Sequence, residues 1–171
     1  DKIVKYLDIP IQHINDDILR RMNRRGTGRE IRTLFQTLRE RIPELVLRTS
    51  LITGLPGEGE AEFEELCAFL EEAQIERAGV FTFSPEEGTP AAAMEHPDEE
   101  TAVRRAERIQ ELQGRVLDRF AEAQVGRVLE VLTEGFDEEQ NAWTGRTWAD
   151  SPEIDSFICF DGQAAAGSFA S

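Results

Sequence analysis

With 171 residues, 40% of them hydrophobic, the chain is long enough for one globular domain, or for a domain and a small module. No apolar run approaches the roughly 20 residues of a membrane-spanning helix, and the first residues lack the pattern of a signal peptide, so we expect a cytoplasmic protein with no membrane partner. Cys67 and Cys159 are too few for a disulfide framework and too far apart in sequence for a Cys-x-x-Cys pair, so we expect no metal ligands in this chain.

The net charge of −15 is unevenly distributed along the chain. Residues 1–55 carry eleven basic and seven acidic side chains, whereas residues 126–171 carry two basic and nine acidic ones. Because nucleic-acid binding depends on Lys and Arg side chains that neutralise phosphates, the last segment is a poor candidate for binding RNA and suits a basic protein better. Solubility alone is the alternative explanation of this charge.

The first half of the chain predicts strands that alternate with helices. Proline and glycine end the successive segments, and the helical segments carry apolar residues at helical spacing. The expected elements are a strand over residues 2–10, a helix over 15–26, a helix from Thr27 or Gly28 to Pro43, and a strand over 45–53. This last strand is aliphatic with little alternation, which is typical of a strand covered on both faces in a parallel sheet.

Polar side chains interrupt this central strand, and a glycine-rich turn follows it. Arg48, Ser50 and Thr53 lie within the strand, and Gly54 and Gly57 permit positive φ angles in the turn. Because polar side chains near the carboxyl ends of parallel strands mark the place where such sheets bind ligands, we expect a pocket there. An ordinary strand-to-helix loop with a hydrogen-bonded arginine is the alternative.

The middle of the chain continues the alternation of strands and helices. We expect an amphipathic helix with an acidic outer face over about 60–73, a strand over 78–83, a loop over 84–90 and a long helix over 97–123. Three strands that alternate with helices predict a parallel sheet with right-handed crossovers, and therefore an α/β architecture.

The pattern changes near residue 125, and we place a boundary there between domains 1–125 and 126–171. Short alternating segments predict a small antiparallel β module, with strands over 127–134, 143–148 and 156–160 and a polar turn over 137–141. The tail, 162–171, is rich in Ala, Gly and Ser and is expected to be disordered or an unnatural end. So short a module is expected to be incomplete or to lean on the first domain.

Three motifs, in this order, closely resemble the radical-SAM methylthiotransferases: Tyr-Leu-Asp-Ile-Pro-Ile-Gln-His at residues 6–13, Arg-Thr-Ser-Leu-Ile-Thr-Gly-Leu-Pro-Gly-Glu at 48–58, and the segment 80–91. The resemblance covers residues 3 to about 160. It implies the carboxyl-terminal half of a (β/α) radical-SAM barrel over 1–125, followed by the start of a TRAM domain, truncated and with a flexible tail, over 126–171. In this family the TRAM domain docks the substrate.

The wording of the first motif favours one branch of that family. Members that act on tRNA usually read Pro-x-Gln-Ser-Gly, whereas this chain has Pro-Ile-Gln-His at residues 10–13. The form found here is similar to the enzymes that add a methylthio group to an aspartate of small-subunit ribosomal protein twelve. The resemblance therefore implies that this basic protein is the substrate and that RNA is not the direct target.

The resemblance also implies two cofactors, S-adenosylmethionine (SAM) and a pair of 4Fe-4S clusters in the complete enzyme. Such enzymes hold one cluster on a Cys-x-x-x-Cys-x-x-Cys loop and the other on three cysteines of an amino-terminal domain. Neither set exists in a chain with two cysteines. We therefore expect a part of such an enzyme that is inactive by itself, with the cluster ligands upstream.

The resemblance also implies roles for individual residues of the SAM site, which are carried over to the matching positions of this chain. Gln12 and Arg48 are assigned to the polar end of SAM, Ser50 and residues 52–54, including Gly54, to its ribose and adenine edge, and Phe83 to packing against adenine. Arg48 is the leading candidate, because a guanidinium can clamp a carboxylate with two parallel hydrogen bonds. The family usually has glycine where Ser50 stands, and Phe83 is as readily a core residue.

The catalytic residue is left unassigned. His13 is a candidate proton carrier, but a lone histidine beside a turn is more often a hydrogen-bonded structural residue, and we favour that interpretation. For docking of the substrate, the β module offers acidic side chains and an aromatic anchor, with Glu130, Glu134, Asp137 and Trp143 as the candidates.

Two other classes of function remain open from the sequence. The chain could be a non-catalytic acidic module that binds basic proteins, which a SAM-binding test would distinguish. It could instead be part of a tRNA methylthiotransferase, in which case the basic run over residues 20–29 would be the RNA-binding surface rather than a solvated helix face.

Overall fold

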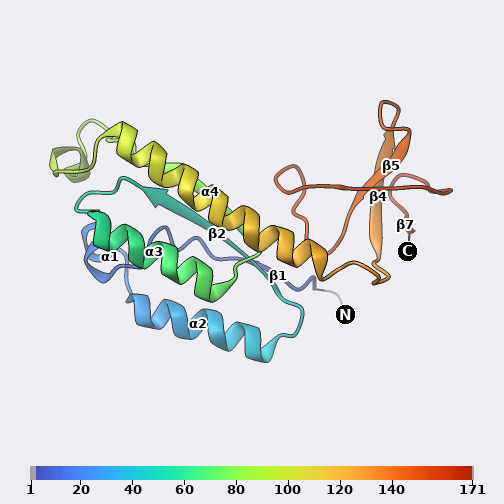
Figure 1. The fold of residues 1–171 in the computed structure, drawn as a ribbon, viewed down its shortest axis with the longest axis horizontal. Coiled ribbons are helices and arrows are strands. Elements are labelled where there is room, and N and C mark those ends of the chain that lie inside the picture. Colours follow the sequence, from blue (N-terminus) through green and yellow to red (C-terminus); the bar gives the residue numbers. More distant parts are fainter. Residues whose placement is uncertain (1–2, 171) are drawn as a thin grey trace. The chain divides into compact units, whose positions relative to one another are not determined.

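The computed structural model describes residues 3–170 and divides them into two compact units (Figure 1). One unit is formed by Leu7–Ala123, and the other by the chain from Gln124 onwards together with the segment that ends at Tyr6. Among residues 3–170, every helix is too short or too polar to span a bilayer.

The first unit is the α/β unit, and it confirms the predicted architecture. Its sheet has the order β1-β2-β3, and β2 and β3 run parallel, from Arg48 beside Arg77 to Thr53 beside Thr82. In chain order the elements are β1 (Tyr6–Asp8), α1 (Asp16–Arg21), α2 (Gly28–Arg41), β2 (Val46–Thr53), α3 (Glu60–Ala73), β3 (Arg77–Thr82), the 3₁₀ helix η1 (Pro90–Ala93) and α4 (Glu99–Glu122).

Local side-chain caps explain where the helices begin. The Asn15 side chain accepts hydrogen bonds from the first turn of α1, and the Asp98 side chain accepts one from the Thr101 N–H in α4. Thr27 and Glu30 form a reciprocal capping box at the start of α2. Each cap satisfies backbone N–H groups that have no partner within the helix, so these starts are encoded within a few residues of sequence.

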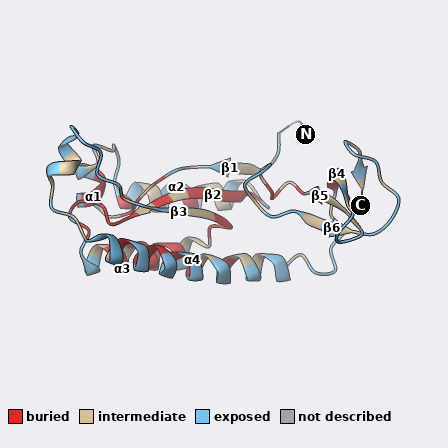
Figure 2. Ribbon diagram, turned by 90° about the horizontal axis from the view of Figure 1, so that it is seen from above, coloured by how far each residue is buried: buried red, intermediate tan, exposed pale blue. Residues whose placement is uncertain are grey.

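The core of this unit lies between the sheet and the helices α3 and α4, which cover one face of the sheet (Figure 2). Side chains of β2 alternate accordingly, with Leu47, Thr49 and Leu51 fully buried. The residues between them are only half-buried, so the prediction that this strand is covered on both faces is wrong for the structure described. The aliphatic composition reflects one deeply buried face rather than two.

The other side of β2 and β3 forms what we call the open face of the sheet. It is defined by Arg48, Ser50 and Ile52 of β2 and by Gly79 and Phe81 of β3, since Ser50 pairs with Gly79 and Ile52 pairs with Phe81. The side chain of Phe81 is 61% exposed. An aromatic ring left exposed in this way is unusual for a sheet residue and marks the face as available for contacts.

The second unit contains a curled antiparallel sheet of order β6-β5-β4-β7, in agreement with the predicted β module. Its strands are β4 (Val131–Asp137), β5 (Ala142–Arg146), β6 (Ile158–Phe160) and β7 (Phe169–Ala170). The first strand begins four residues later than predicted. β5 ends at Arg146 because the Thr147 N–H donates to the Asp150 carboxylate and turns the chain.

The tail of the chain departs from the prediction of disorder up to residue 170. β7 pairs with the start of β4, with Ala170 beside Val131 and Phe169 beside Leu132. Two further backbone hydrogen bonds join Thr133 to Gly167 and Ser168, at 2.8 and 2.9 Å. Strands pair through backbone N–H and C=O groups, and every residue except proline carries both. The small side chains of the tail therefore do not prevent its pairing with β4.

Candidate functional site

Arg48, the leading candidate for the polar end of SAM, lies on the open face of the sheet. It is the third residue of β2 and therefore lies near the amino end of the strand, not at the carboxyl end where we expected it. Its Nη1 donates to Asp8 Oδ2 at 2.6 Å, and its side chain is 16% exposed. One edge of the guanidinium is thus already occupied by a carboxylate of the chain itself.

Gln12 and Ser50 are neighbours of Arg48 on the same part of the sheet. The Gln12 N–H donates to the Ser50 carbonyl and the Gln12 carbonyl accepts from the Ile52 N–H, both at 2.9 Å. Gly79 lies beside Ser50, and a Cβ built there would approach only the Phe81 ring, at 3.7 Å, and Arg48 Nη2, at 3.9 Å. The Arg48 guanidinium therefore lies beside a position where the neighbouring strand has no side chain, and Gln12 is joined to β2 through its backbone. Guanidinium, hydroxyl and carboxamide groups are donors that suit carboxylate and hydroxyl groups.

Gly54 and Phe83, the candidates for the adenine side, follow the carboxyl ends of β2 and β3. Gly54 has φ +78°, and a Cβ there would lie 2.6 Å from Ala102 Cβ of α4, so helix packing alone requires glycine. The Phe83 N–H donates to the Thr53 carbonyl at 2.8 Å, and its ring packs edge-on against His96 with centroids 5.3 Å apart. Both residues thus have packing roles that need no ligand.

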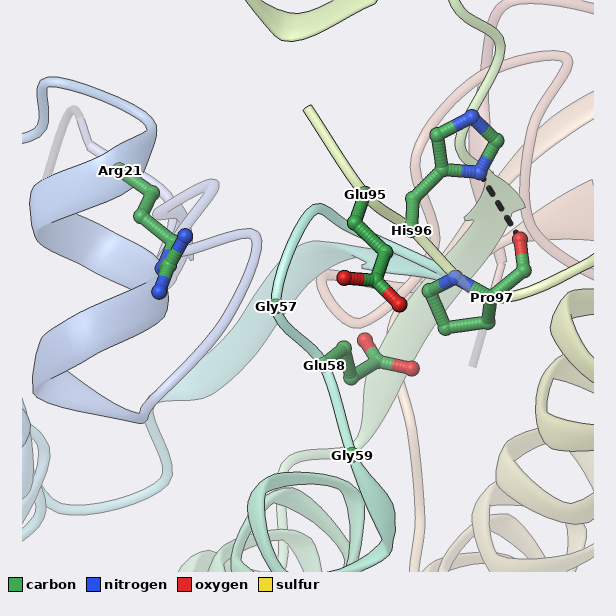
Figure 3. Close-up of a pocket in the computed structure, with 7 residues that line it drawn as sticks. All are labelled: Arg21, Gly57, Glu58, Gly59, Glu95, His96 and Pro97. Atoms are coloured by element: carbon green, nitrogen blue, oxygen red, sulfur yellow. Dashed lines mark hydrogen bonds between the residues drawn. The ribbon is translucent and has the colours of Figure 1, made fainter. Parts of the chain in front are cut away.

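A cavity of about 410 Å³ lies at the turn after β2, where the glycines and polar residues predict a pocket (Figure 3). Arg21, at the end of α1, borders it on one side, and Glu95 and His96 border it on the other. Gly57 has φ +83°, and a Cβ there would lie 2.8 Å from Arg21 Nε, so the arginine lies directly against the glycine backbone. The remaining lining residues are Glu58, Gly59 and Pro97.

Glu58 of the cavity lining also belongs to a buried cluster that we define by His13, Glu58 and Arg105. Arg105 Nη1 donates to Glu58 Oε1 at 2.8 Å and to the Glu58 carbonyl at 3.0 Å, and the Gly54 N–H donates to the same Oε1 at 3.0 Å. His13 Nε2 lies 3.5 Å from Glu58 Oε2. His13 Nδ1 accepts a hydrogen bond from the Asn15 N–H, so a neutral ring carries its proton on Nε2 and points it at the carboxylate.

The charge of Glu58 is stabilised within this cluster despite its burial. Burial raises the pKa of the Glu58 carboxyl, but the His13 ring, the Gly54 N–H and Arg105 outweigh that effect and hold the pKa below its ordinary value. His13, Glu58 and Arg105 come from the first motif, the second motif and α4. The cluster therefore joins three segments, which agrees with the structural interpretation of His13.

Several residues of this region were not predicted from the sequence. Arg105 stands between Ala102 and Ile109 at helical spacing, on the buried stripe of α4, and that position was a usable signal of a buried arginine. Arg21 and His96 had no such signal, because they reach the cavity from segments far from the glycine-rich turn.

The cysteines do not fit the iron–sulfur cluster that the resemblance implies. Cys67 is buried in α3, and burial raises the pKa of its thiol to about 11, so it is not a ready thiolate ligand. Cys159 is exposed on β6, in the other unit. Three thiolates are needed for such a site, and the chain holds two cysteines, so no step of a reaction can be assigned to a cluster bound by these residues.

The docking candidates of the β unit are already engaged in local contacts, apart from the exposed Glu130. Glu134 Oε1 accepts from Arg146 Nε at 2.8 Å. Asp137 Oδ1 accepts from the backbone N–H groups of the turn that follows, at 2.8 and 3.1 Å. Trp143 packs edge-on against Phe136, with centroids 5.4 Å apart, and its Nε1 donates to the Gly162 carbonyl at 3.1 Å.

Comparisons with known protein families match two separate parts of the chain. Residues 1–70 match the Radical SAM superfamily and residues 125–171 match the TRAM domain. Proteins named ribosomal protein uS12 methylthiotransferase RimO are similar to this chain over nearly its whole length. The one from Bdellovibrio bacteriovorus is 45% identical over 169 residues, the one from Lachnoclostridium phytofermentans 48% over 158, and the one from Thermotoga maritima 44% over 174.

The chain is thus similar, over both of its units, to methylthiotransferases, and its first 70 residues match the Radical SAM superfamily. The three alignments cover 97%, 92% and 99% of this chain, but 37%, 36% and 39% of the respective relatives, so the chain spans well under half of their length. Radical-SAM proteins in general use SAM and an iron–sulfur cluster. The two cysteines of this chain are too few to hold such a cluster.

A solved structure supports the fold of the barrel part. Coproporphyrinogen III oxidase (HemN) of Escherichia coli, described as a radical SAM enzyme, superimposes with a TM-score of 0.54. The match covers 66% of this chain and 27% of that chain at 21% identity, so the likeness concerns the fold alone.

Proposed function

We propose that this chain is part of an enzyme that transfers a methylthio group to an aspartate of ribosomal protein uS12. The observation that carries the proposal is the identity of 44–48% to the three uS12 methylthiotransferases over both units of the chain. The His-containing form of the motif at residues 10–13 supports the protein-modifying branch over the tRNA-modifying branch.

Within such an enzyme, the open face of the sheet would form one wall of the SAM site. SAM bound to a reduced cluster supplies radical chemistry, and the proposal assigns two 4Fe-4S clusters to the complete enzyme, with cysteines contributed from outside the matched segment. Gln12 and Arg48 would bind the polar end of SAM and Ser50 its ribose. Gly54 and Phe83 would lie on the adenine side, where the Phe83 ring excludes water.

The β unit would dock the protein substrate. Its nine acidic and two basic side chains favour a basic partner, because opposite charges attract over roughly a Debye length of about 8 Å at physiological salt. Glu130, Glu134, Asp137 and Trp143 are the proposed contacts. The enzyme would act in the cytoplasm, where ribosomal proteins are made, and RNA would not be its direct target.

A gene replacement tests this function. The matched segment of the Thermotoga maritima relative would be replaced by residues 1–171, and the chimera expressed in a bacterium that lacks its own copy of the gene. We expect the mass of uS12 from purified ribosomes to increase by one methylthio group on an aspartate. Unmodified uS12 in a strain whose chimera carries its full iron content would contradict the proposal.

A further inference from the structure

Gln12 has an unusual backbone conformation for a residue with a side chain. Its φ is +66°, in the left-handed region that favours glycine, and it is held there by hydrogen bonds to Ser50 and Ile52 of β2. Conformations of this kind persist where the surroundings impose them, and they concentrate at functional sites. The backbone therefore fixes the place from which the Gln12 side chain leaves the sheet.

Arg24 holds that side chain from a separate segment. Its Nη1 donates to Gln12 Oε1 at 2.9 Å, and its Nη2 donates to the Pro10 carbonyl at 2.6 Å. The Arg24 N–H in turn donates to the Leu19 carbonyl of α1 at 2.9 Å, which anchors the arginine backbone. Both oxygens that accept hydrogen bonds from the Arg24 guanidinium are neutral, so these bonds position the segment over residues 10–12 and do not form an ion pair.

The chemistry of the two groups decides which way the carboxamide faces. A guanidinium has five donors and no acceptor, so the amide atom that faces Arg24 must be the oxygen. The amide nitrogen is then directed away, and its two N–H groups remain for another partner. Because Arg24 fixes this orientation, the Gln12 side chain offers donors to any further partner on its other side.

We infer that Arg24 is a positioning residue that makes Gln12 a hydrogen-bond donor to the carboxylate of bound SAM. The inference rests on the proposed function, in which Gln12 and Arg48 meet the polar end of SAM. It also gives Arg24 a place inside the fold, whereas the sequence left the basic run over residues 20–29 open as an RNA-binding surface.

Binding of SAM to the chimera with the Thermotoga maritima relative tests the inference. Gln12→Glu keeps an oxygen facing Arg24 but removes the donor, so the fold is retained while the SAM dissociation constant rises by at least about tenfold. Arg24→Gln frees the carboxamide to flip, and we expect a rise of several fold. Arg25→Gln is the matched control, since Arg25 is an exposed neighbour, and it should bind SAM as the parent does.

A second ligand separates positioning from general damage. Decarboxylated SAM lacks the group that Gln12 is inferred to bind, so neither Gln12→Glu nor Arg24→Gln should weaken it as they weaken SAM. Equal losses for both ligands, or none for SAM, would overturn the role of Arg24 while leaving the proposed function intact. A parent chimera that carries its clusters but binds no SAM in calorimetry would overturn the proposed function and this inference together.

Discussion

His13 Nε2 and Glu58 Oε2 lie 3.5 Å apart, and neither side chain is exposed to solvent. That distance is longer than a hydrogen bond, and among residues 3–170 neither atom has a hydrogen-bond partner, although the other Glu58 oxygen is bonded to Arg105 and to the Gly54 N–H. Arg105 and the Gly54 N–H therefore bond one oxygen of the buried carboxylate directly, and the His13 ring faces the other oxygen and adds to the stabilisation of its charge.

Glu58→Gln should strongly destabilise the α/β unit. The substitution leaves the buried Arg105 with only the exposed Glu60 carboxylate, at 3.3 Å, as a charged partner, and removal of one member of a buried pair costs about 3–5 kcal/mol. Chemical denaturation of the 171-residue chain measures the loss. Glu64→Gln is the matched control, because Glu64 forms a solvent-exposed pair with Arg108 and its loss should have little effect on stability. Equal losses for the two variants would contradict the role of the cluster.

The same carboxyl predicts a pH dependence of stability. The pKa of Glu58 in the folded chain lies below its ordinary value, so the unfolded chain binds the proton more tightly. The stabilisation is fully present above the unfolded pKa, about 4.3, and is lost as the pH falls through the lower folded pKa. Thermal unfolding at a series of pH values checks this, and the Glu58→Gln variant should lack that part of the slope.

Gly54→Ala should destabilise the chain by more than Gly88→Ala. Both glycines have positive φ, at +78° and +82°, which costs an alanine about 1 kcal/mol, but a Cβ at Gly54 would also lie 2.6 Å from Ala102 Cβ. Overpacking of this kind adds about 1–3 kcal/mol. Among residues 3–170, no atom beyond Gly88 and its chain neighbours lies within 4 Å of a Cβ built at Gly88. If Ala102→Gly failed to recover part of the Gly54→Ala loss, the packing explanation would be wrong.

Arg48→Ala should weaken SAM binding in the chimera more than Arg41→Ala does. Loss of a charged hydrogen bond to the SAM carboxylate costs about 1.5–3 kcal/mol, whereas Arg41 is an exposed residue at the end of α2. Asp8→Asn adds a further test, because Asp8 competes for the same guanidinium and its neutralisation should not weaken SAM. Equal affinities of the Arg48→Ala and Arg41→Ala variants in calorimetry would remove Arg48 from the site.

Local features of the sequence predicted most helices and strands. Most of the features that were not predicted depend on contacts between segments far apart in the chain. The helix over 60–73 was predicted to its ends because its amphipathic pattern is contained in one segment. The bond between Arg24 and Gln12 and the pairing of β7 with β4 join residues that no local pattern connects. The exposure of one face of β2 was missed because an aliphatic run does not reveal how many sides are covered.

The candidate site was predictable only in part. The motif at 48–58 correctly marked a cavity after β2, but Arg48 itself lies near the other end of that strand and pairs with Asp8. The sequence of a strand does not show which of its polar side chains will pair with another residue of the chain. The partner of Arg48 is Asp8, which lies 40 positions earlier and is brought to it by the pairing of the strands.

Charge reversal in the β unit should slow capture of the protein substrate. Changing Glu130, Glu134 and Asp137 to lysine in the chimera removes the attraction to a basic protein, and we expect slower association with isolated uS12 and a weaker salt dependence. SAM cleavage without substrate should not change. Association that matches the parent across a salt series would make the acidic surface a solubility feature only.

A competition between two substrates tests the central claim most directly. The chimera would be incubated with SAM, a sulfur source, a reductant, isolated uS12 and bulk tRNA in one reaction, and both products analysed by mass spectrometry. We predict a methylthio group on an aspartate of uS12 and none on any tRNA nucleoside. Methylthiolated nucleosides with unmodified uS12 would contradict the account.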